Sequence, residues 1–233
     1  MDTTFIFRIA PSRLDVRSFN EGFRREGIPG YRLSCNGSFF FYPGGPGPVT
    51  VGPVGLDGEN SLKSGNQKYA YKRGTLARIG ARISVRRLID VKGGVAEDVN
   101  RTFSIAKPDK VSELMGGGFM LVDNGIVQTN EKIDSEQGVP GKTNYQLTAT
   151  RGNIIFANDK SGNAYLIMSV NKALRSPLAI AALLGAEFPF MALFDGGGPF
   201  WFRDRKGQAP SQDGRSEPPM LAVAMVGDFV RSI

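Results

Sequence analysis

Two segments of the chain repeat one pattern of apolar and polar positions. The segments are residues 18–42 and 176–202. Each has a helix-like run that ends at a glycine, then a short apolar strand, and then a polar residue followed by glycine and by aromatic residues. The polar residue is Asn36 in the first segment and Asp195 in the second. Glycines at a strand tip let a ligand approach the backbone closely. The pattern therefore predicts that Asn36 and Asp195 lie at neighbouring strand tips and line one pocket.

The second segment carries the clearest helix signals in the chain. Ser176 is a good N-cap, Pro177 suits the first helical position, and Gly185 ends the run. Gly27 ends the helix of the first segment in the same way, because glycine tolerates the left-handed conformation that often closes a helix. The apolar body of the second helix predicts that it is deeply buried, and residues 190–194 follow it as a core strand.

The N-terminal part of the chain predicts a strand and then a helix. Residues 3–9 alternate between apolar and polar side chains, as a strand does. After them, Ser12 can cap a helix that has Val16, Phe19 and Phe23 on one face. We therefore expect a helix to follow the first strand directly.

Two hairpins are predicted in the second half of the chain. The first combines a glycine turn at 116–118, a strand at 119–122 and an Asp-Asn-Gly turn at 123–125. The second has strands on both sides of a turn at 159–163. A glycine triplet can be a simple turn or a backbone surface that lies against a ligand, and the second triplet at 196–198 favours the latter use.

These elements predict a single α+β domain over residues 1–233, with a mixed, mainly antiparallel β-sheet and a few packed helices. At 233 residues and 41% hydrophobic, the chain can bury a substantial core without disulfides or metals. Its only cysteine, Cys35, excludes an intramolecular disulfide framework and is predicted to be a buried thiol. The Gly- and Pro-rich loop at 43–58 is either the lid or wall of a site or a plain surface excursion.

The absence of histidine restricts the chemistry. Ser-His-Asp and Cys-His triads are impossible, and so is a His-ligated zinc or iron site. Any acid–base step must therefore use Asp, Glu, Lys, Tyr or water. The sequence indicates no cofactor and gives no secure metal site, although Asp195 with Asp123 or Asp159 could hold a hard cation through oxygens.

The net charge of +7 and the pI near 9.6 indicate either an anionic partner or a merely solvated basic surface. Basic residues are dense in the middle of the chain, where apolar residues alternate with them and favour strands with one solvated face over a nucleic-acid groove. Tyr69 and Tyr71 could stack on bases, but no RNA-binding signature surrounds them, so a nucleic-acid partner is disfavoured. The basic residues of this stretch are Lys68, Lys72, Arg73, Arg78, Arg82, Arg86 and Arg87.

No stretch approaches the roughly 20 apolar residues that a membrane span needs. No apolar segment follows a basic start at the N-terminus, so the chain is expected to be soluble and to show no export signal. The sequence leaves open whether a signal peptide has been removed, and it does not indicate the compartment or the oligomeric state.

The order of motifs resembles a known family. Residues 36–40, 114–127, 148–159 and 192–200 together look like the phosphodiester glycosidase domain of the lysosomal uncovering enzyme, N-acetylglucosamine-1-phosphodiester α-N-acetylglucosaminidase, and its bacterial relatives. The resemblance covers nearly the whole chain from about residue 15 onward. The family's Asn-x-x-Phe-Phe run and its Leu-Asp-Gly-Gly-Gly-Ser run are matched by Asn36, Phe39, Phe40, Asp195, Gly196, Gly197 and Gly198.

Two departures from the family pattern bear on activity. Leu147 stands where the family's Arg-Thr-Ala run has the arginine expected to face a phosphate, and Pro199 replaces the serine after the glycine triplet. The proline removes a hydroxyl and a backbone donor together. Arg151 lies a few residues beyond Leu147 and is the leading candidate to replace the lost charge.

The resemblance implies hydrolysis of a bond between the anomeric carbon of a sugar and a phosphodiester. By the same resemblance, Asp195 is the catalytic carboxylate, and Asn36 bonds the sugar or orients that carboxylate. Turn capping is the structural alternative for Asp195. The expected substrate-binding positions, which offer backbone amides or a charge, are Gly37, Ser38, Gly117, Gly118, Arg151, Gly196, Gly197 and Gly198.

Two functional hypotheses follow from these residues. In the first, the chain is a glycosidase that hydrolyses a small molecule or glycan bearing a sugar-1-phosphodiester. In the second, it keeps the family's pocket but has lost catalytic groups, and it binds a phosphorylated sugar or nucleotide-like ligand without turnover. The loss of both the arginine and the serine keeps the second hypothesis open.

Overall fold

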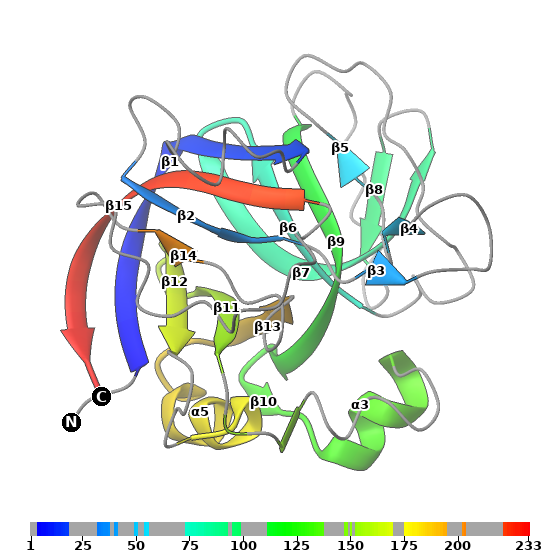
Figure 1. The fold of residues 1–233 in the computed structure, drawn as a ribbon. Helices are drawn as coiled ribbons and strands as arrows, with labels where there is room; N and C mark the ends of the chain where they lie inside the picture. Colours follow the sequence, from blue (N-terminus) through cyan, green and yellow to red (C-terminus); the bar gives the residue numbers. More distant parts are fainter. Residues whose placement is uncertain are drawn as a thin grey trace.

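The computed structural model describes a β-rich protein in which most elements belong to one extended sheet (Figure 1). The residues that the structure describes are 4–18, 32–37, 40–41, 49–50, 54–55, 73–92, 95–98, 111–137, 147–148, 150, 152–169, 175–194, 202–203 and 221–233.

The strands and helices follow one another along the chain in three groups. The N-terminal strands are β1 (Thr4–Ser18), β2 (Leu33–Asn36), β3 (Phe40–Phe41), β4 (Val49–Thr50) and β5 (Val54–Gly55). The central elements are β6 (Gly74–Ile79), β7 (Arg82–Lys92), β8 (Val95–Asp98), β9 (Val111–Asp123), β10 (Ile126–Val127) and α3 (Asn130–Gln137). The C-terminal elements are β11 (Asn153–Asn158), β12 (Ala164–Ser169), α5 (Pro177–Leu184), β13 (Phe190–Phe194), β14 (Phe202–Arg203) and β15 (Leu221–Ser232).

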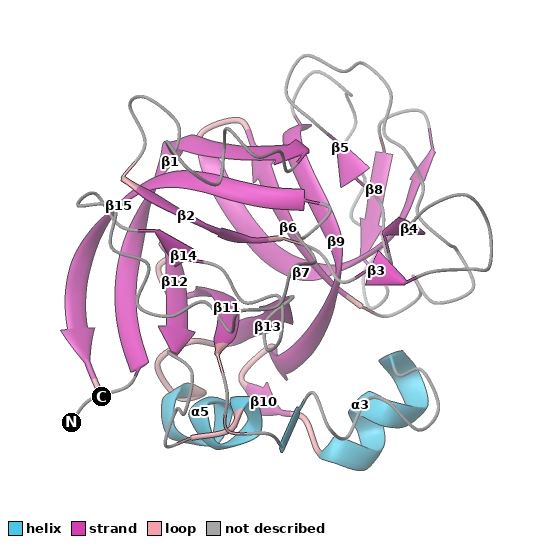
Figure 2. Ribbon diagram, viewed as in Figure 1, coloured by secondary structure: helices cyan, strands magenta, loops and turns pink. Residues whose placement is uncertain are grey.

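The sheet order is β14-β2-β15-β1-β12-β11-β13-β9-β6-β7-β8, with β10 and β5 also pairing with β9. Each pairing between described strands is antiparallel. The expectation of an α+β fold with a mixed sheet is therefore wrong, because the fold is mostly antiparallel β-sheet. Of the described elements only α3 and α5 are α-helices, and Figure 2 shows both beneath the sheet.

Successive side chains of the central strands enter two separate buried clusters. In β11, Ile154 and Phe156 belong to the first cluster, whereas Ile155 and Ala157 belong to the second. Side chains alternate between the two faces of a strand, so a strand buried on both faces is apolar throughout. The first cluster is enclosed by the curled sheet itself, with residues from β1, β2, β6, β7, β9 and β15. The second cluster lies between the sheet and the helices and includes residues of α3 and α5.

Helix α5 starts and ends where its sequence signals predict, but the conformation at its end and the extent of its burial differ from the expectation. The Ser176 side chain caps it by accepting from the Ala179 backbone N–H, and Pro177 opens it. Gly185 ends it in the right-handed conformation, at φ −61°, so the expected left-handed closure is wrong. Glycine is needed there for space, because a Cβ atom would lie 2.8 Å from the Ala181 carbonyl oxygen. Only one face is buried, since Leu183 is 54% exposed.

The prediction of a helix directly after the first strand is wrong for the residues that the structure describes. Strand β1 continues to Ser18, and Val16 pairs with Val223 of β15. The pairing with β15 shifts register between Ile9 and Leu14, and a bulge of this kind bends a long strand so that it can follow a curved sheet. Tertiary pairing therefore overrides the local helical pattern. Phe19, Phe23 and Gly27 lie outside the described residues.

Both hairpin turns are confirmed, but the glycine turn at 116–118 is wrong. Asn124 and Gly125 take positive φ angles in the first hairpin. In the second, the Asp159 carboxylate accepts from the backbone N–H groups of Ser161 and Asn163. The glycine triplet at 116–118 lies inside β9, which pairs with β6 as far as Gly118 and with β13 from Phe119 onward. The triplet marks an exchange of partner strands along one continuous strand.

Candidate functional site

The structure places only part of the residues expected at the site. Asn36 is the last residue of β2 and pairs with Ala222, and the buried Gly37 follows it. Gly117 and Gly118 lie in the middle of β9. The other expected site residues lie outside the described part of the chain, and their roles stay predictions; they are Ser38, Arg151, Asp195, Gly196, Gly197 and Gly198.

Strands β2 and β13 are not neighbours in the sheet, which corrects the expectation of adjacent strand tips. Strands β15, β1, β12 and β11 lie between them in the sheet order. They nevertheless face the same interior, because Cys35 of β2 and Phe194 of β13 belong to the same buried cluster. Asp195 directly follows Phe194 but lies outside the described residues. One pocket shared by Asn36 and Asp195 therefore stays a prediction.

The glycines of β6 and β9 let three strands approach closely near the end of β13. Gly74 pairs with Gly118, and a Cβ atom on Gly74 would lie 2.7 Å from the Ala192 Cβ. A Cβ atom on Gly118 would lie 2.9 Å from the Leu193 carbonyl oxygen and 2.9 Å from the Phe194 ring. Even alanine at either position would force neighbouring atoms to move. We call Gly74, Gly117 and Gly118 the glycine junction, and it adjoins the residue that precedes Asp195.

Arg73 is a buried cation at the glycine junction. Its side chain is 2% exposed, one Nη donates to the Gly117 carbonyl oxygen at 2.8 Å, and its guanidinium carbon lies 4.3 Å from the centre of the Phe119 ring. Its Nε–H has no hydrogen-bond partner among the described residues. Burial lowers the pKa of Arg73 to about 9, so the group is still a cation at neutral pH. Nor does any carboxylate in the described part of the chain form an ion pair with it.

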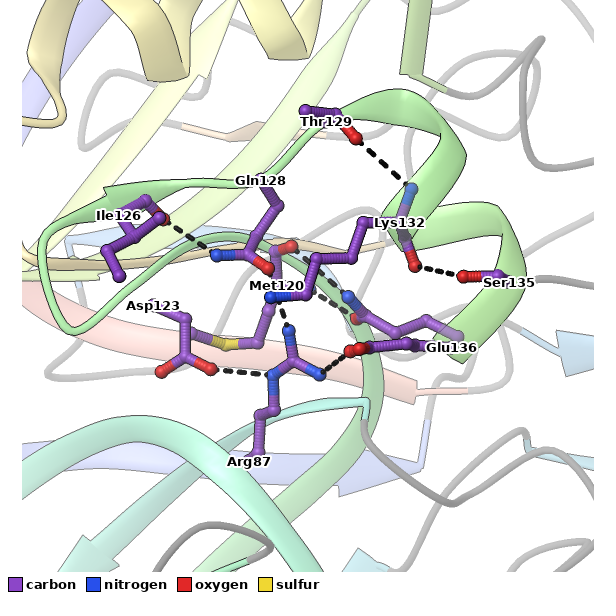
Figure 3. Close-up of polar contacts among 10 residues, drawn as sticks. Arg87, Met120, Asp123, Ile126, Gln128, Thr129, Lys132, Ser135 and Glu136 are labelled. Carbon is purple, nitrogen blue, oxygen red and sulfur yellow. Dashed lines mark hydrogen bonds and ion pairs between the residues drawn. The ribbon is translucent and has the colours of Figure 1, made fainter.

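Arg87 is also buried, at 4% exposure, but it is neutralised (Figure 3). Its Nε lies 2.8 Å from an Asp123 oxygen, and its two Nη atoms reach Glu136 at 2.7 Å and Gln128 at 3.3 Å. These contacts join β7, the end of β9 and α3. The expectation that the basic residues of this stretch form a solvated face is therefore wrong for Arg73 and Arg87, although Arg82 is exposed.

Other buried polar side chains also join facing strands. The Asn158 side chain accepts from the Val85 N–H at 2.7 Å and donates to the Ile83 carbonyl oxygen at 3.0 Å, which links β11 to β7. The Glu113 carboxylate accepts from the Val16 N–H at 2.7 Å and thereby links β9 to β1. Because buried polar groups require hydrogen bonds, these contacts explain why both residues tolerate burial.

Of the acidic residues weighed as hard-cation ligands, Asp123 and Asp159 have structural partners, and Asp195 lies outside the described residues. Asp123 is held by Arg87, and Asp159 accepts from Ser161, Asn163 and the Tyr165 hydroxyl. Burial acts to raise the pKa of Asp159, but the hydrogen bonds, foremost from Asn163, outweigh it and lower the pKa. Within the described part of the chain, no group of three or more Cys, Asp or Glu residues is placed to hold a metal ion.

Cys35 is confirmed as a buried thiol, and burial raises its pKa. A thiol with a raised pKa is protonated at neutral pH and is a poor nucleophile. Leu147, which stands where the resemblance expects an arginine, is fully buried in the cluster on the helix side of the sheet. None of the described helices is both long and apolar enough to cross a membrane.

Three solved structures are similar to this chain. The catalytic domain of zebrafish N-acetylglucosamine-1-phosphodiester α-N-acetylglucosaminidase, auto-inhibited by its pro-peptide, matches with a TM-score of 0.64 and 14% identity over 97% of this chain and 83% of that one. A Burkholderia pseudomallei protein matches with a TM-score of 0.64 and 12% identity over 95% of this chain and 73% of that one. A Synechocystis protein matches with a TM-score of 0.54 and 13% identity over 98% of this chain and 59% of that one.

No protein-family profile and no curated protein matches the sequence. At these identities, the structural similarity describes the fold alone. It supports a distant structural relationship to the zebrafish catalytic domain.

Proposed function

We propose that this chain is a hydrolase that cleaves the bond between the anomeric carbon of a sugar and a phosphodiester. Three observations support the proposal. The fold is similar to a catalytic domain that acts on such a bond, the sequence carries the Asn36 and Asp195 motifs, and a buried cation adjoins the residue before Asp195. The buried cation carries most weight, because no described carboxylate compensates it and a buried charge of this kind is a mark of ligand-binding and reactive sites.

The proposed reaction assigns one task to each group. Water attacks the anomeric carbon, the bond from that carbon to the phosphate oxygen breaks, and the phosphate monoester leaves with the electron pair. Asp195 takes the proton of the attacking water, and Asn36 hydrogen-bonds the sugar or orients the carboxylate. Phosphate is a good leaving group, so a strong general acid is less necessary than for an ordinary glycoside.

A second function is favoured by the departures from the family pattern. The chain could bind a phosphorylated sugar or a nucleotide-like ligand without hydrolysing it. The supporting observation is that Leu147, at the position of the family's arginine, is a core residue with no polar atom in its side chain. Pro199 adds to this argument from the sequence alone.

An activity screen with one variant separates the two functions. The purified chain is incubated with a panel of sugar-1-phosphodiesters and nucleotide sugars, and released sugar is detected. We expect Asp195→Asn to lower turnover by on the order of a hundredfold or more while the circular dichroism spectrum stays unchanged. If the wild type binds these ligands but hydrolyses none, the binding function replaces the enzymatic one. An Asp195→Asn chain that unfolds would instead assign Asp195 to turn capping.

A further inference from the structure

We propose that Arg73 is the anion-binding residue of the site and receives the phosphate oxygens of the ligand through its guanidinium N–H donors. The identity of the anion as a phosphodiester rests on the proposed function, whereas the anion site itself rests on the geometry around Arg73. This role differs from the sequence prediction, which names Arg151 as the leading cation.

The first step of the argument compares two buried arginines in the same protein. Arg87 is 4% exposed and contacts the carboxylates of Asp123 and Glu136. Arg73 is 2% exposed and, within the described structure, has only a carbonyl oxygen and an aromatic ring as polar or π partners. Buried charges are normally paired, and the described part of the chain supplies Arg73 with no anion, so a ligand can supply it.

The second step concerns the hydrogen bonds that Arg73 leaves open. A guanidinium group presents several N–H donors in a planar fork, and this fork matches two oxygens of a phosphate or carboxylate. The Gly117 carbonyl oxygen takes one donor, and the buried Nε–H has no partner among the described residues. An anion that accepted from Nε–H and the neighbouring Nη would supply both the missing charge and the missing hydrogen bonds.

The third step concerns the position of Arg73 relative to the predicted catalytic carboxylate. Arg73 directly precedes Gly74, which pairs with Gly118, and a Cβ atom on Gly118 would lie 2.9 Å from the ring of Phe194. Asp195, the predicted catalytic carboxylate, is the next residue in the chain. A phosphate held at Arg73 would therefore lie at the end of β13 from which the Asp195 segment starts.

The test follows the Nε–H resonance of Arg73 in ¹⁵N-labelled protein by NMR, assigned by its loss in Arg73→Lys. The probe is dimethyl phosphate, a monoanionic diester that carries no sugar, and acetate is titrated in parallel. We expect a saturable shift of the Arg73 resonance with dimethyl phosphate at lower concentration than with acetate. The Arg87 Nε–H, which already lies against Asp123, should not move.

Variants measure the contribution of the side chain to binding. Arg73→Lys keeps the charge but loses the fork, so we expect affinity for dimethyl phosphate to fall by on the order of tenfold, and Arg73→Met should bind no measurable probe. Arg32→Gln is the matched control, because it removes one positive charge from an exposed pair with Asp228. It should bind as the wild type does.

Three results would overturn the inference. In the first, the Arg73 resonance stays fixed at high probe concentration. In the second, Arg73→Met binds the probe as well as the wild type does. In the third, the wild type binds no probe and the Asp195→Asn substitution alone moves the Arg73 resonance. The last result would make Asp195 the internal counter-ion of Arg73. Saturable binding together with no hydrolysis of any sugar phosphodiester would leave the anion site standing and reject only the hydrolase function.

Discussion

Replacing Arg73 with methionine should make the ligand-free protein more stable. Arg73 is a charge held in a low-dielectric interior, and among the described residues no carboxylate offsets it. Methionine has a similar length, carries no charge, and can keep a contact between its sulfur and the Phe119 ring. Natural proteins often sacrifice stability at functional sites, and substitution there commonly raises stability while it removes function.

The magnitude follows from the pKa of Arg73. Burial lowers it from the ordinary arginine value to about 9, and at about 1.4 kcal/mol per pH unit this difference corresponds to about 5 kcal/mol of unfavourable free energy in the folded state. The substitution would leave the Gly117 carbonyl oxygen without its donor, at about 1–3 kcal/mol, and would remove a cation–π contact of about 0.5–2 kcal/mol. We expect a net gain of up to about 3.5 kcal/mol in the free energy of unfolding.

Urea and thermal denaturation at neutral pH measure this change, with a rise in Tm of about 2–4 °C for each kcal/mol in a chain of this size. Arg87→Met is the control, because it removes the cation from Asp123 and Glu136 and should lower stability by about 3 kcal/mol. A loss of several kcal/mol in Arg73→Met as well would refute the reasoning, since it would show that Arg73 neutralises a carboxylate of the chain.

The pH dependence gives an independent check with a defined sign. The folded-state pKa of Arg73 lies below the unfolded value, so the unfolded chain binds more protons at this group above about pH 9. The destabilising contribution is complete below pH 9 and diminishes above it. The stability advantage of Arg73→Met over the wild type should therefore be constant from pH 6 to 8 and should shrink as the pH rises from about 9 to 11.

Two further substitutions test the local geometry. Gly118→Ala would place a Cβ atom 2.9 Å from the Phe194 ring, so we expect a loss of about 1–3 kcal/mol by urea denaturation and a matching loss of dimethyl phosphate binding. Unchanged stability would mean that the strands of the glycine junction can move apart at little cost. Asp159→Asn should lower stability by about 1 kcal/mol at pH 7, because the carboxylate accepts several hydrogen bonds, foremost from Asn163. Since its pKa is lowered in the folded state, this loss should diminish as the pH falls through that pKa, and a loss that does not change with acidification would contradict the assignment.

Local signals in the sequence predicted the elements that local interactions stabilise. Ser176 and Pro177 mark the start of α5 because capping and the fixed φ of proline act within one helical turn. The Asp159 turn was predictable for the same reason, since its side chain bonds backbone groups a few residues away. The strand that ends at Phe194 was evident from its continuous apolar run.

The rest depended on which strands pair, and a single sequence does not contain that information in its local pattern. Val16 suits a helix face by spacing, yet its pairing with Val223 makes it part of β1. The fold class was wrong because helices were inferred from such local spacing. Arg73 and Arg87 have the same sequence context as solvated basic residues, and only the packing of β6, β7 and β9 buries them. The one available signal for Arg73 was its position directly before a glycine and an apolar strand, which is weak.

The position of β1 in the sheet has a consequence for how the chain reaches its native state. Phe5 pairs with Met168 of β12 on one side and with Ser232 of β15 on the other, so the first described strand is completed by the last one. Such distant pairing requires closure of very long loops, which slows folding. On the ribosome, β1 would emerge early with both backbone edges open, and it would need protection from other chains until β12 and β15 have been synthesised.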